Sequence, residues 1–179
     1  MTHTWAILRC HSQSTCSAVR RLEAQAVAAE AGALAVSFLL EGELALLRIP
    51  AARAQRRIDG LWRHTCFEVF VRANDGTYRE FNFSPSSEWA AYAFADYRDG
   101  GPLAVAMPPR VDARVEGDRL LLDALLPAGV LPARESGAGW RLGLTAVIED
   151  AQGALSYWAL EHAAGRPDFH HPDGFVLHL

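Results

Sequence analysis

Two short stretches near the middle of the chain alternate apolar and polar side chains. In residues 66–71 the alternation separates Glu68 from the main apolar face, and in residues 78–83 it does the same for Glu80 and Asn82. An Asn-Asp-Gly turn signal between them predicts a hairpin, with the polar side chains together on one face. Two carboxylates and an amide placed together can hydrogen-bond the hydroxyl groups of a polar ligand.

An alternative gives these acids a purely structural role. Arg63, Arg79 or Arg98 could pair with Glu68 and Glu80, since structural ion pairs are common in proteins. The face would then be filled, without a pocket, and the chain would be a structural or protein-interaction module that recruits a partner through its edge strands. The sequence leaves both interpretations open.

Tryptophan side chains offer a second kind of ligand contact. Trp62, with Arg63 beside it, and Trp89 lie next to predicted loops, where a flat indole ring can stack on a sugar. Trp5 and Trp140 lie in apolar runs and are expected in the core, because a single Trp more often packs than binds. Trp62 and Trp89 are therefore the aromatic candidates for a binding site.

The C-terminal region holds a histidine cluster that admits two interpretations. His162, His170 and His171, with Asp168, are of the types that bind zinc, but their spacing matches no recognised zinc motif. Met107 with a histidine would be a conceivable axial pair for haem, a combination that most proteins contain by chance. We expect loop-bracing hydrogen bonds, no metal and no cofactor, with His162 and His170 at the rim of the ligand site.

Signals for catalysis are weak. The chain has no GxSxG, HExxH, Walker or GxGxxG pattern, and no Lys that could serve a P-loop or a Schiff base. Cys66 and His64 would share one face of a strand, but no third group that orients them is evident. Glu68 and Glu80 could in principle hydrolyse a glycoside, but a small domain without a cleft-forming insertion disfavours that reaction. We expect no enzymatic activity.

Length and composition describe an ordinary globular chain. Its 179 residues fit a single domain, residues 1–179, and half of them are hydrophobic. The formal charge of −4, without a basic patch, argues against nucleic acid as a partner. The N-terminus lacks signal-peptide features, no apolar stretch reaches the about 18 to 20 residues of a membrane span, and three cysteines without CxxC spacing argue against disulfides. We expect a cytoplasmic protein that does not enter the membrane; the sequence leaves its oligomeric state open.

Many short strands separated by turn signals predict an all-β fold, a two-sheet antiparallel β-sandwich of jelly-roll or immunoglobulin-like type. The turn signals include residues 41–42, 99–101 and 137–139, and the first of these predicts a hairpin between 34–40 and 43–49. The other expected strands are 4–9, 66–71, 78–83, 89–96, 110–115, 119–125, 140–149, 156–161 and 175–178.

Residues 17–32 give conflicting signals. A good N-cap at Ser17, strong helix formers and the terminal Gly32 favour a helix, with Leu22 and Ala26 on one helical face. The same stretch also fits an extended strand in which Leu22, Ala24 and Ala26 lie on one side.

Several motifs together resemble the DOMON-like domains related to family-9 carbohydrate-binding modules. The resemblance is carried by residues 59–70 and 78–85, and it extends to 89–92, 156–160 and 167–170. It implies a two-sheet antiparallel sandwich that binds a sugar or haem on a concave face. It also implies that residues 17–32 are extended, and we follow it there.

The same resemblance assigns roles to individual residues. Trp62 stands where sugar-binding relatives stack an aromatic ring on the ligand, whereas haem-binding relatives use a Met and a His as axial ligands. Met107 lies in a Pro-rich loop and does not fit that role. Ser86 and Ser87 stand where a Gly is usual, and no secretion signal is present, so the ligand could be an intracellular metabolite.

The leading hypothesis is therefore a non-catalytic module that binds a carbohydrate or a similar polar small molecule. A haem-binding or redox-partner domain and a structural interaction module are the alternatives. The expected ligand-binding residues are Trp62, Arg63, Glu68, Glu80, Asn82, Trp89, His162 and His170.

Overall fold

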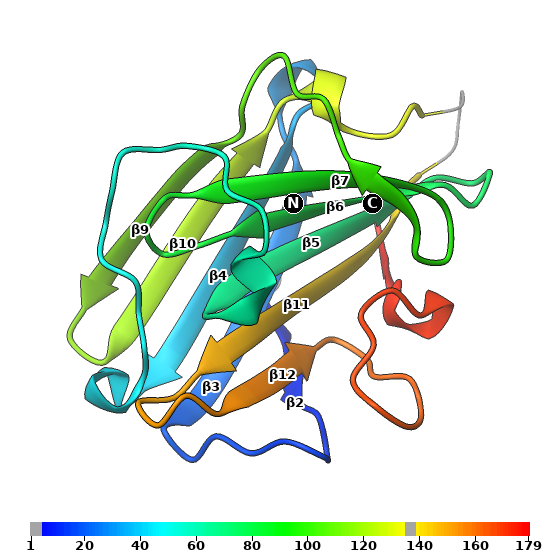
Figure 1. The fold of residues 1–179 in the computed structure, drawn as a ribbon. Helices are drawn as coiled ribbons and strands as arrows, with labels where there is room; N and C mark the ends of the chain where they lie inside the picture. The colour runs from blue at the N-terminus through cyan, green and yellow to red at the C-terminus, as the bar shows by residue number, and fades with distance from the viewer. Residues whose placement is uncertain (1–4, 135–138) are drawn as a thin grey trace.

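Alternating apolar side chains turn one face of each strand inward, and two antiparallel sheets pack with these faces together. The computed structural model describes residues 5–134 and 139–179. Within these ranges the chain forms a β-sandwich with no α-helix, only short 3-10 turns (Figure 1). This architecture confirms the predicted two-sheet antiparallel sandwich. None of the described helical turns has the length and apolar character of a membrane span.

The first sheet has five strands. In spatial order they are β1 (Ala6–Ile7), β3 (Val19–Ala28), β4 (Leu34–Gly42), β10 (Arg119–Leu126) and β9 (Arg110–Glu116). The second sheet runs β2 (Arg9–Cys10), β12 (Leu155–Ala159), β11 (Arg141–Glu149), β5 (Cys66–Arg72), β6 (Tyr78–Phe83), β7 (Trp89–Asp96) and β8 (Asp99–Pro102), with β13 (Leu177–His178) paired to β11. The 3-10 turns are η1 (Glu30–Gly32), η2 (Leu44–Leu46), η3 (Leu61–Arg63), η4 (Ala128–Val130) and η5 (Pro172–Gly174).

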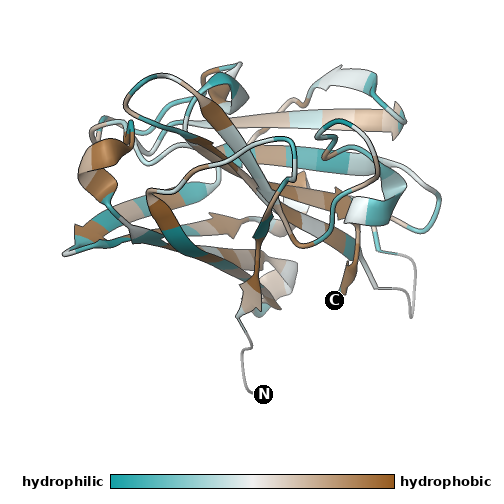
Figure 2. Cartoon of the chain, turned by 90° about the horizontal axis from the view of Figure 1, so that it is seen from below, coloured by the Kyte–Doolittle hydropathy of each residue, from teal (hydrophilic) through white to brown (hydrophobic). Residues whose placement is uncertain are grey.

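The core lies between the two sheets. Phe67, Val69 and Val71 of β5 point into it, as do Phe81 and Phe83 of β6. The hydropathy colours in Figure 2 change along individual strands, because successive residues face opposite sides of a sheet. The two predicted strands around the Asn-Asp-Gly turn are confirmed as β5 and β6, paired as a hairpin.

Strand β3 resolves the conflict over residues 17–32 in favour of the extended form. Leu22 and Ala24 are fully buried there, and the strand forms a long ladder with β4. The helix that local propensity favours is therefore wrong. Pairing on both sides of β3, with β1 and with β4, outweighs an intrinsic preference of a few tenths of a kcal/mol per residue.

Two predicted turns are wrong because their glycines lie within strands of a sheet. The signal at residues 41–42 lies inside β4, which is followed by η2 instead of a hairpin partner, and the signal at 99–101 forms strand β8. A Cβ atom at Gly42 would overlap the carbonyl oxygen of Ala18, and one at Gly100 would overlap that of Ala93. These glycines permit close backbone approach within a sheet, and neither provides a turn.

The chain termini also depart from expectation. The strand expected over residues 4–9 is two short strands, because the chain crosses from the first sheet to the second at the buried Leu8. Residue 4 and most of the turn expected at 137–139 lie outside the described residues. At the C-terminus, where one strand is expected over 175–178, only the two residues of β13 are in a strand, and η5 ends just before this stretch.

We expect Gly42→Ala to destabilise the fold by about 2 kcal/mol or more, because β3 and β4 must separate to admit the methyl group. Urea unfolding measures this change. Gly129→Ala is the matched control, since a Cβ atom at Gly129 meets no atom within 4 Å. Equal stability of the two variants would contradict the close approach at Gly42.

Candidate functional site

The outer face of β5 and β6 carries a buried row of polar side chains. Glu68 pairs in register with Asn82, and Phe70 with Glu80, so the three polar groups are neighbours on one face. Glu68 is 2% exposed, Glu80 6% and Asn82 0%. The face assignment made from alternation is confirmed, but the polar groups lie buried among aromatic rings and not on a solvated surface.

A cavity of about 500 Å³ lies above this face. Strands β5, β6, β7, β11 and β12 contribute its floor, while η3, β8 and the segment 167–170 form its walls. Figure 1 shows the five floor strands as neighbours in one sheet. Its aromatic lining consists of Trp62, Phe70, Tyr92, Phe94, Tyr157 and Phe169, and its polar side chains are Glu68, Glu80, Arg98 and His170. Mainly apolar and aromatic hollows of this size with a few polar side chains are typical of small-molecule sites.

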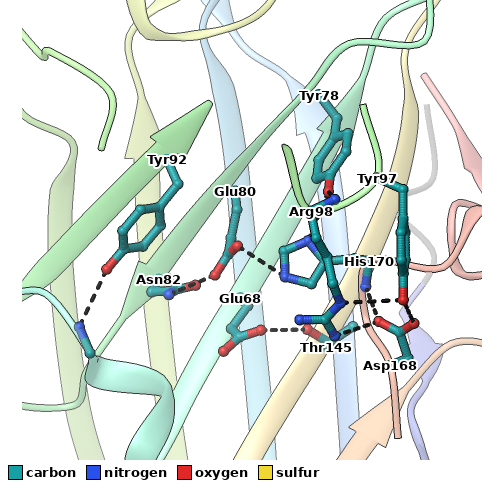
Figure 3. Close-up of polar contacts among 11 residues, drawn as sticks. Glu68, Tyr78, Glu80, Asn82, Tyr92, Tyr97, Arg98, Thr145, Asp168 and His170 are labelled. Atoms are coloured by element: carbon teal, nitrogen blue, oxygen red, sulfur yellow. Dashed lines mark hydrogen bonds and ion pairs between the residues drawn. The ribbon is translucent and has the colours of Figure 1, made fainter. Parts of the chain in front are cut away.

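The carboxyl groups have incomplete hydrogen bonding (Figure 3). Thr145 Oγ1 donates to Glu68 Oε2 over 3.3 Å, and Asn82 Nδ2 donates to Glu80 Oε1 over 2.9 Å. Glu68 Oε1 and Asn82 Oδ1 are buried and have no hydrogen-bond partner in the part of the chain that the structure describes. Leaving a buried acceptor unsatisfied costs roughly 1–3 kcal/mol, and a donor from a ligand would remove that cost.

Within residues 5–134 and 139–179, no arginine pairs with these acids. Arg98 binds Asp168 at 2.7 Å, Arg79 donates to the carbonyl oxygen of Leu131, and the guanidinium of Arg63 lies 5.1 Å from the Trp62 ring centre. The alternative in which Arg63, Arg79 or Arg98 neutralises Glu68 and Glu80 is therefore wrong. The filled face that it required is also wrong, because the cavity is open.

His170 completes the polar row from the opposite wall. Its Nδ1 lies 2.9 Å from the Tyr78 hydroxyl, and its Nε2 lies 3.6 Å from Glu80 Oε2. The Tyr78 hydroxyl accepts from the backbone N–H of Arg98, so it is placed to donate to Nδ1. The proton of the neutral ring is then on Nε2, directed towards Glu80.

Two hydrogen-bonded anchors hold the cavity walls. Asp168 accepts from Arg98 Nη2 at 2.7 Å and from the Tyr97 hydroxyl at 2.6 Å, which fixes the C-terminal segment to the β7–β8 turn (Figure 3). At the other wall the Tyr92 hydroxyl donates to Asp59 and accepts from the Gly60 N–H. This second anchor positions η3, with Trp62 47% exposed at the cavity edge.

Burial shifts the pKa values of the three titratable side chains of this row, Glu68, Glu80 and His170. Burial raises the pKa of Glu80 to about 7, and burial together with the nearby charge of Glu80 raises the pKa of Glu68 well above its ordinary value. Burial, assisted by the charge of Arg98, lowers the pKa of His170 to about 4. His170 is therefore neutral near pH 7, and its contact with Glu80 is not an ion pair.

Four of the eight expected ligand-binding residues line this cavity, namely Trp62, Glu68, Glu80 and His170. Asn82 and Arg63 touch lining residues without lining it themselves. The loop-side role expected for Trp89 conflicts with its position, since it is 6% exposed and packs in the core beside Arg57. Trp140 lies in the core as expected, whereas Trp5 is only half-buried.

His162 belongs to a separate hollow, where its Nε2 lies 2.8 Å from the Arg9 carbonyl oxygen. His171 contacts Asp173. Among residues 5–134 and 139–179, no three His, Cys, Asp or Glu side chains come together in a way that could hold a metal ion. Met107 is 65% exposed and lies outside the cavity, so it does not complete a haem site there.

Sequence reasoning missed most of the aromatic lining. Tyr92 and Phe94 were accessible to it, because they alternate along the predicted strand 89–96 and register with Glu80 and Tyr78 of the neighbouring strand. Tyr157 lies on a predicted strand whose neighbours were unknown. Phe169 comes from a loop, and no periodicity indicates where a loop packs.

The fold matches solved structures of sugar-related proteins at low sequence identity. A candidate carbohydrate-binding protein from Bacteroides uniformis is 13% identical, with a TM-score of 0.66, covering 97% of this chain and 84% of that one. A family-9 carbohydrate-binding module from Caldicellulosiruptor kristjanssonii, solved with cellotriose and with glucose, is 10% identical at a TM-score of 0.60, covering 91% of this chain and 75% or 76% of the other. No family model and no curated protein sequence matches the chain. These likenesses establish a shared fold.

We expect Glu80→Gln to gain stability relative to the wild type as the pH rises from 4.5 to 8. The Glu80 carboxyl ionises in the unfolded chain near its ordinary pKa of 4.5 but in the folded chain only at about 7, so the wild type loses stability across that window. The shift corresponds to about 3 kcal/mol. His170 acts in the opposite direction, because its lowered pKa makes the fold lose stability as the pH falls from 6.5 towards 4.

The comparison of variant with wild type isolates Glu80 from His170. Urea unfolding at several pH values measures the difference, and Glu43→Gln, at an exposed position outside the cavity, is the matched control. A stability difference that does not change with pH would show that Glu80 ionises normally in the fold.

Proposed function

We propose that the chain is a non-catalytic module that binds a carbohydrate or a similar polar small molecule in the cavity above β5 and β6. One observation carries the proposal: Glu68 Oε1, a buried acceptor without a partner among the described residues, lies at the base of a hollow whose walls are aromatic. Sugars present hydroxyl donors at their edges and apolar C–H faces, and these two surfaces match the two parts of the site.

The structural neighbours support this proposal. One is a carbohydrate-binding module bound to cellotriose or glucose, and its fold covers most of this chain. The resemblance of residues 59–70 and 78–85 to DOMON-like domains agrees with the same function and is part of the proposal. The cytoplasmic location expected from the sequence remains a prediction.

The roles of the lining residues follow from their positions. Trp62, partly exposed at the edge, is placed to stack on the apolar face of a sugar ring, as Tyr92 and Phe94 are from the floor. Glu68, Glu80 and His170 would hold hydroxyl groups. Because hydrogen bonds already fix both walls, little ordering cost opposes binding.

We expect Trp62→Ala to weaken binding of any sugar ligand by about tenfold or more, because the variant removes a stacking surface without touching the buried polar row. Calorimetric titration with glucose, cellobiose and the hits from a glycan array measures the change. Met107→Ala, at an exposed position away from the cavity, is the control and should bind normally. The proposal fails if no sugar binds the wild type, or if Trp62→Ala binds every ligand found as tightly as the wild type does.

A further inference from the structure

The buried acids of this chain fall into two groups. Three of them pair with arginine: Glu23 with Arg21 at 2.6 Å, Glu88 with Arg56 at 2.8 Å, and Glu149 with Arg48 at 2.7 Å. Glu68 and Glu80, at the cavity, have no such partner among the described residues. The protein therefore neutralises buried carboxyls with its own cations everywhere except where a ligand can reach them.

Among the described residues no arginine forms an ion pair with the cavity carboxyls, although Arg98 lies near enough for its charge to favour the ionised form of Glu80. Arg98 lines the cavity, but it forms its ion pair with Asp168. The ring of His170, 3.6 Å from Glu80, is neutral near pH 7. Glu68 Oε1 and Asn82 Oδ1, both more than nine-tenths buried, have no hydrogen-bond donor among the described residues. The cavity carboxyls thus lack a paired arginine, and one oxygen of Glu68 lacks a donor.

The aromatic walls have the complementary property. The faces of Trp, Tyr and Phe rings carry partial negative charge and attract cations within about 6 Å. The lining supplies six such rings, including Trp62 at the edge and Phe70 beside the carboxyls. A site in which aromatic rings enclose carboxyl groups favours the binding of an ammonium group over the binding of a neutral hydroxyl group.

We propose that the cavity binds a ligand carrying a protonated amine, an amino sugar in particular, with the ammonium group at Glu68 and Glu80. Its N–H donors would satisfy Glu68 Oε1, and its charge would replace the arginine that the other buried acids have. The sugar ring would lie against Trp62. This inference rests on the proposed function and names the ligand class for the same site.

Several titratable and charged groups surround the two carboxyls. They are Cys66 on β5, Tyr78 on β6, Tyr92 on β7, Arg98 in the β7–β8 turn, Tyr157 on β12, and Asp168 and His170 in the C-terminal segment. Burial raises the pKa of Glu80 to about 7, whereas burial and the charge of Arg98 lower the pKa of His170 to about 4, so the His170 ring is already neutral at pH 6. Ionisation of Glu80 therefore controls the charge that a cation meets between pH 6 and pH 8.

The first test compares three sugars that differ only at carbon 2. Calorimetric titration at pH 7.5 of the full chain with glucosamine, glucose and N-acetylglucosamine separates a charged amine from a hydroxyl and from a neutral amide. We expect glucosamine to bind about tenfold or more tightly than either neutral sugar. Equal affinities for all three would overturn the amine assignment and leave the carbohydrate function intact.

The second test removes the carboxyl charges. In the double variant Glu68→Gln and Glu80→Gln we expect the preference for glucosamine over glucose to fall to about one, while Glu43→Gln keeps it. If the double variant does not fold, the single variant Glu80→Gln replaces it, with the preference expected to fall at least threefold. A preference that survives loss of the charges would overturn the proposal.

The third test uses choline, a permanent cation without a sugar ring. We expect its affinity to rise about five- to tenfold from pH 6 to pH 8, as Glu80 ionises. This arm separates the two proposals. If none of the three sugars binds, the carbohydrate function is removed. In that case, choline that binds the wild type but not the Gln variants would still support the cation site. If choline does not bind either, both proposals are overturned.

Discussion

The burial of two carboxyl groups on one sheet face is the constraint on which the site depends. Moving an ionised carboxylate out of water is costly, and a buried acid without a cationic partner reduces the cost by remaining protonated. Glu68 and Glu80 are in this position because strand alternation turns them away from the core, while β7, β11 and the aromatic walls exclude water. The apolar face of the same strands, with Phe67, Val69 and Phe81, holds the hairpin in place against that cost.

The walls of the cavity depend on residues of the same sheet. Tyr92 of β7 anchors the segment that carries η3, and the turn after β7 supplies Arg98, which anchors Asp168. One strand and its turn therefore position two walls that lie more than 100 residues apart along the chain. A charge-assisted hydrogen bond such as that between Arg98 and Asp168 is about twice as strong as a neutral one, which suits a loop with little core of its own.

Sequence reasoning identified the polar floor of the site and two wall residues, Trp62 and His170, but not most of the aromatic lining, for a physical reason. A strand's period of two fixes which side chains share a face, so Glu68, Glu80 and Asn82 were placed correctly before any partner was known. It does not fix what covers that face, so it could not decide between an open polar face and the alternative in which arginines pair with these acids. Gly42 and Gly100 misled in a related way, because the close strand contacts that require them involve residues distant in sequence or across a turn.

A site of this kind exchanges stability for selectivity. Replacing Glu68 and Glu80 by apolar residues would remove the free-energy cost of burying them, as it often does for buried ion pairs. Their presence is therefore explained by a contribution to ligand binding and not by one to stability. A preformed hollow provides that contribution only when the bound group supplies what the protein lacks there. The walls are fixed before binding, the acceptors are unsatisfied, and both features favour a ligand that brings donors and positive charge over one that offers shape alone.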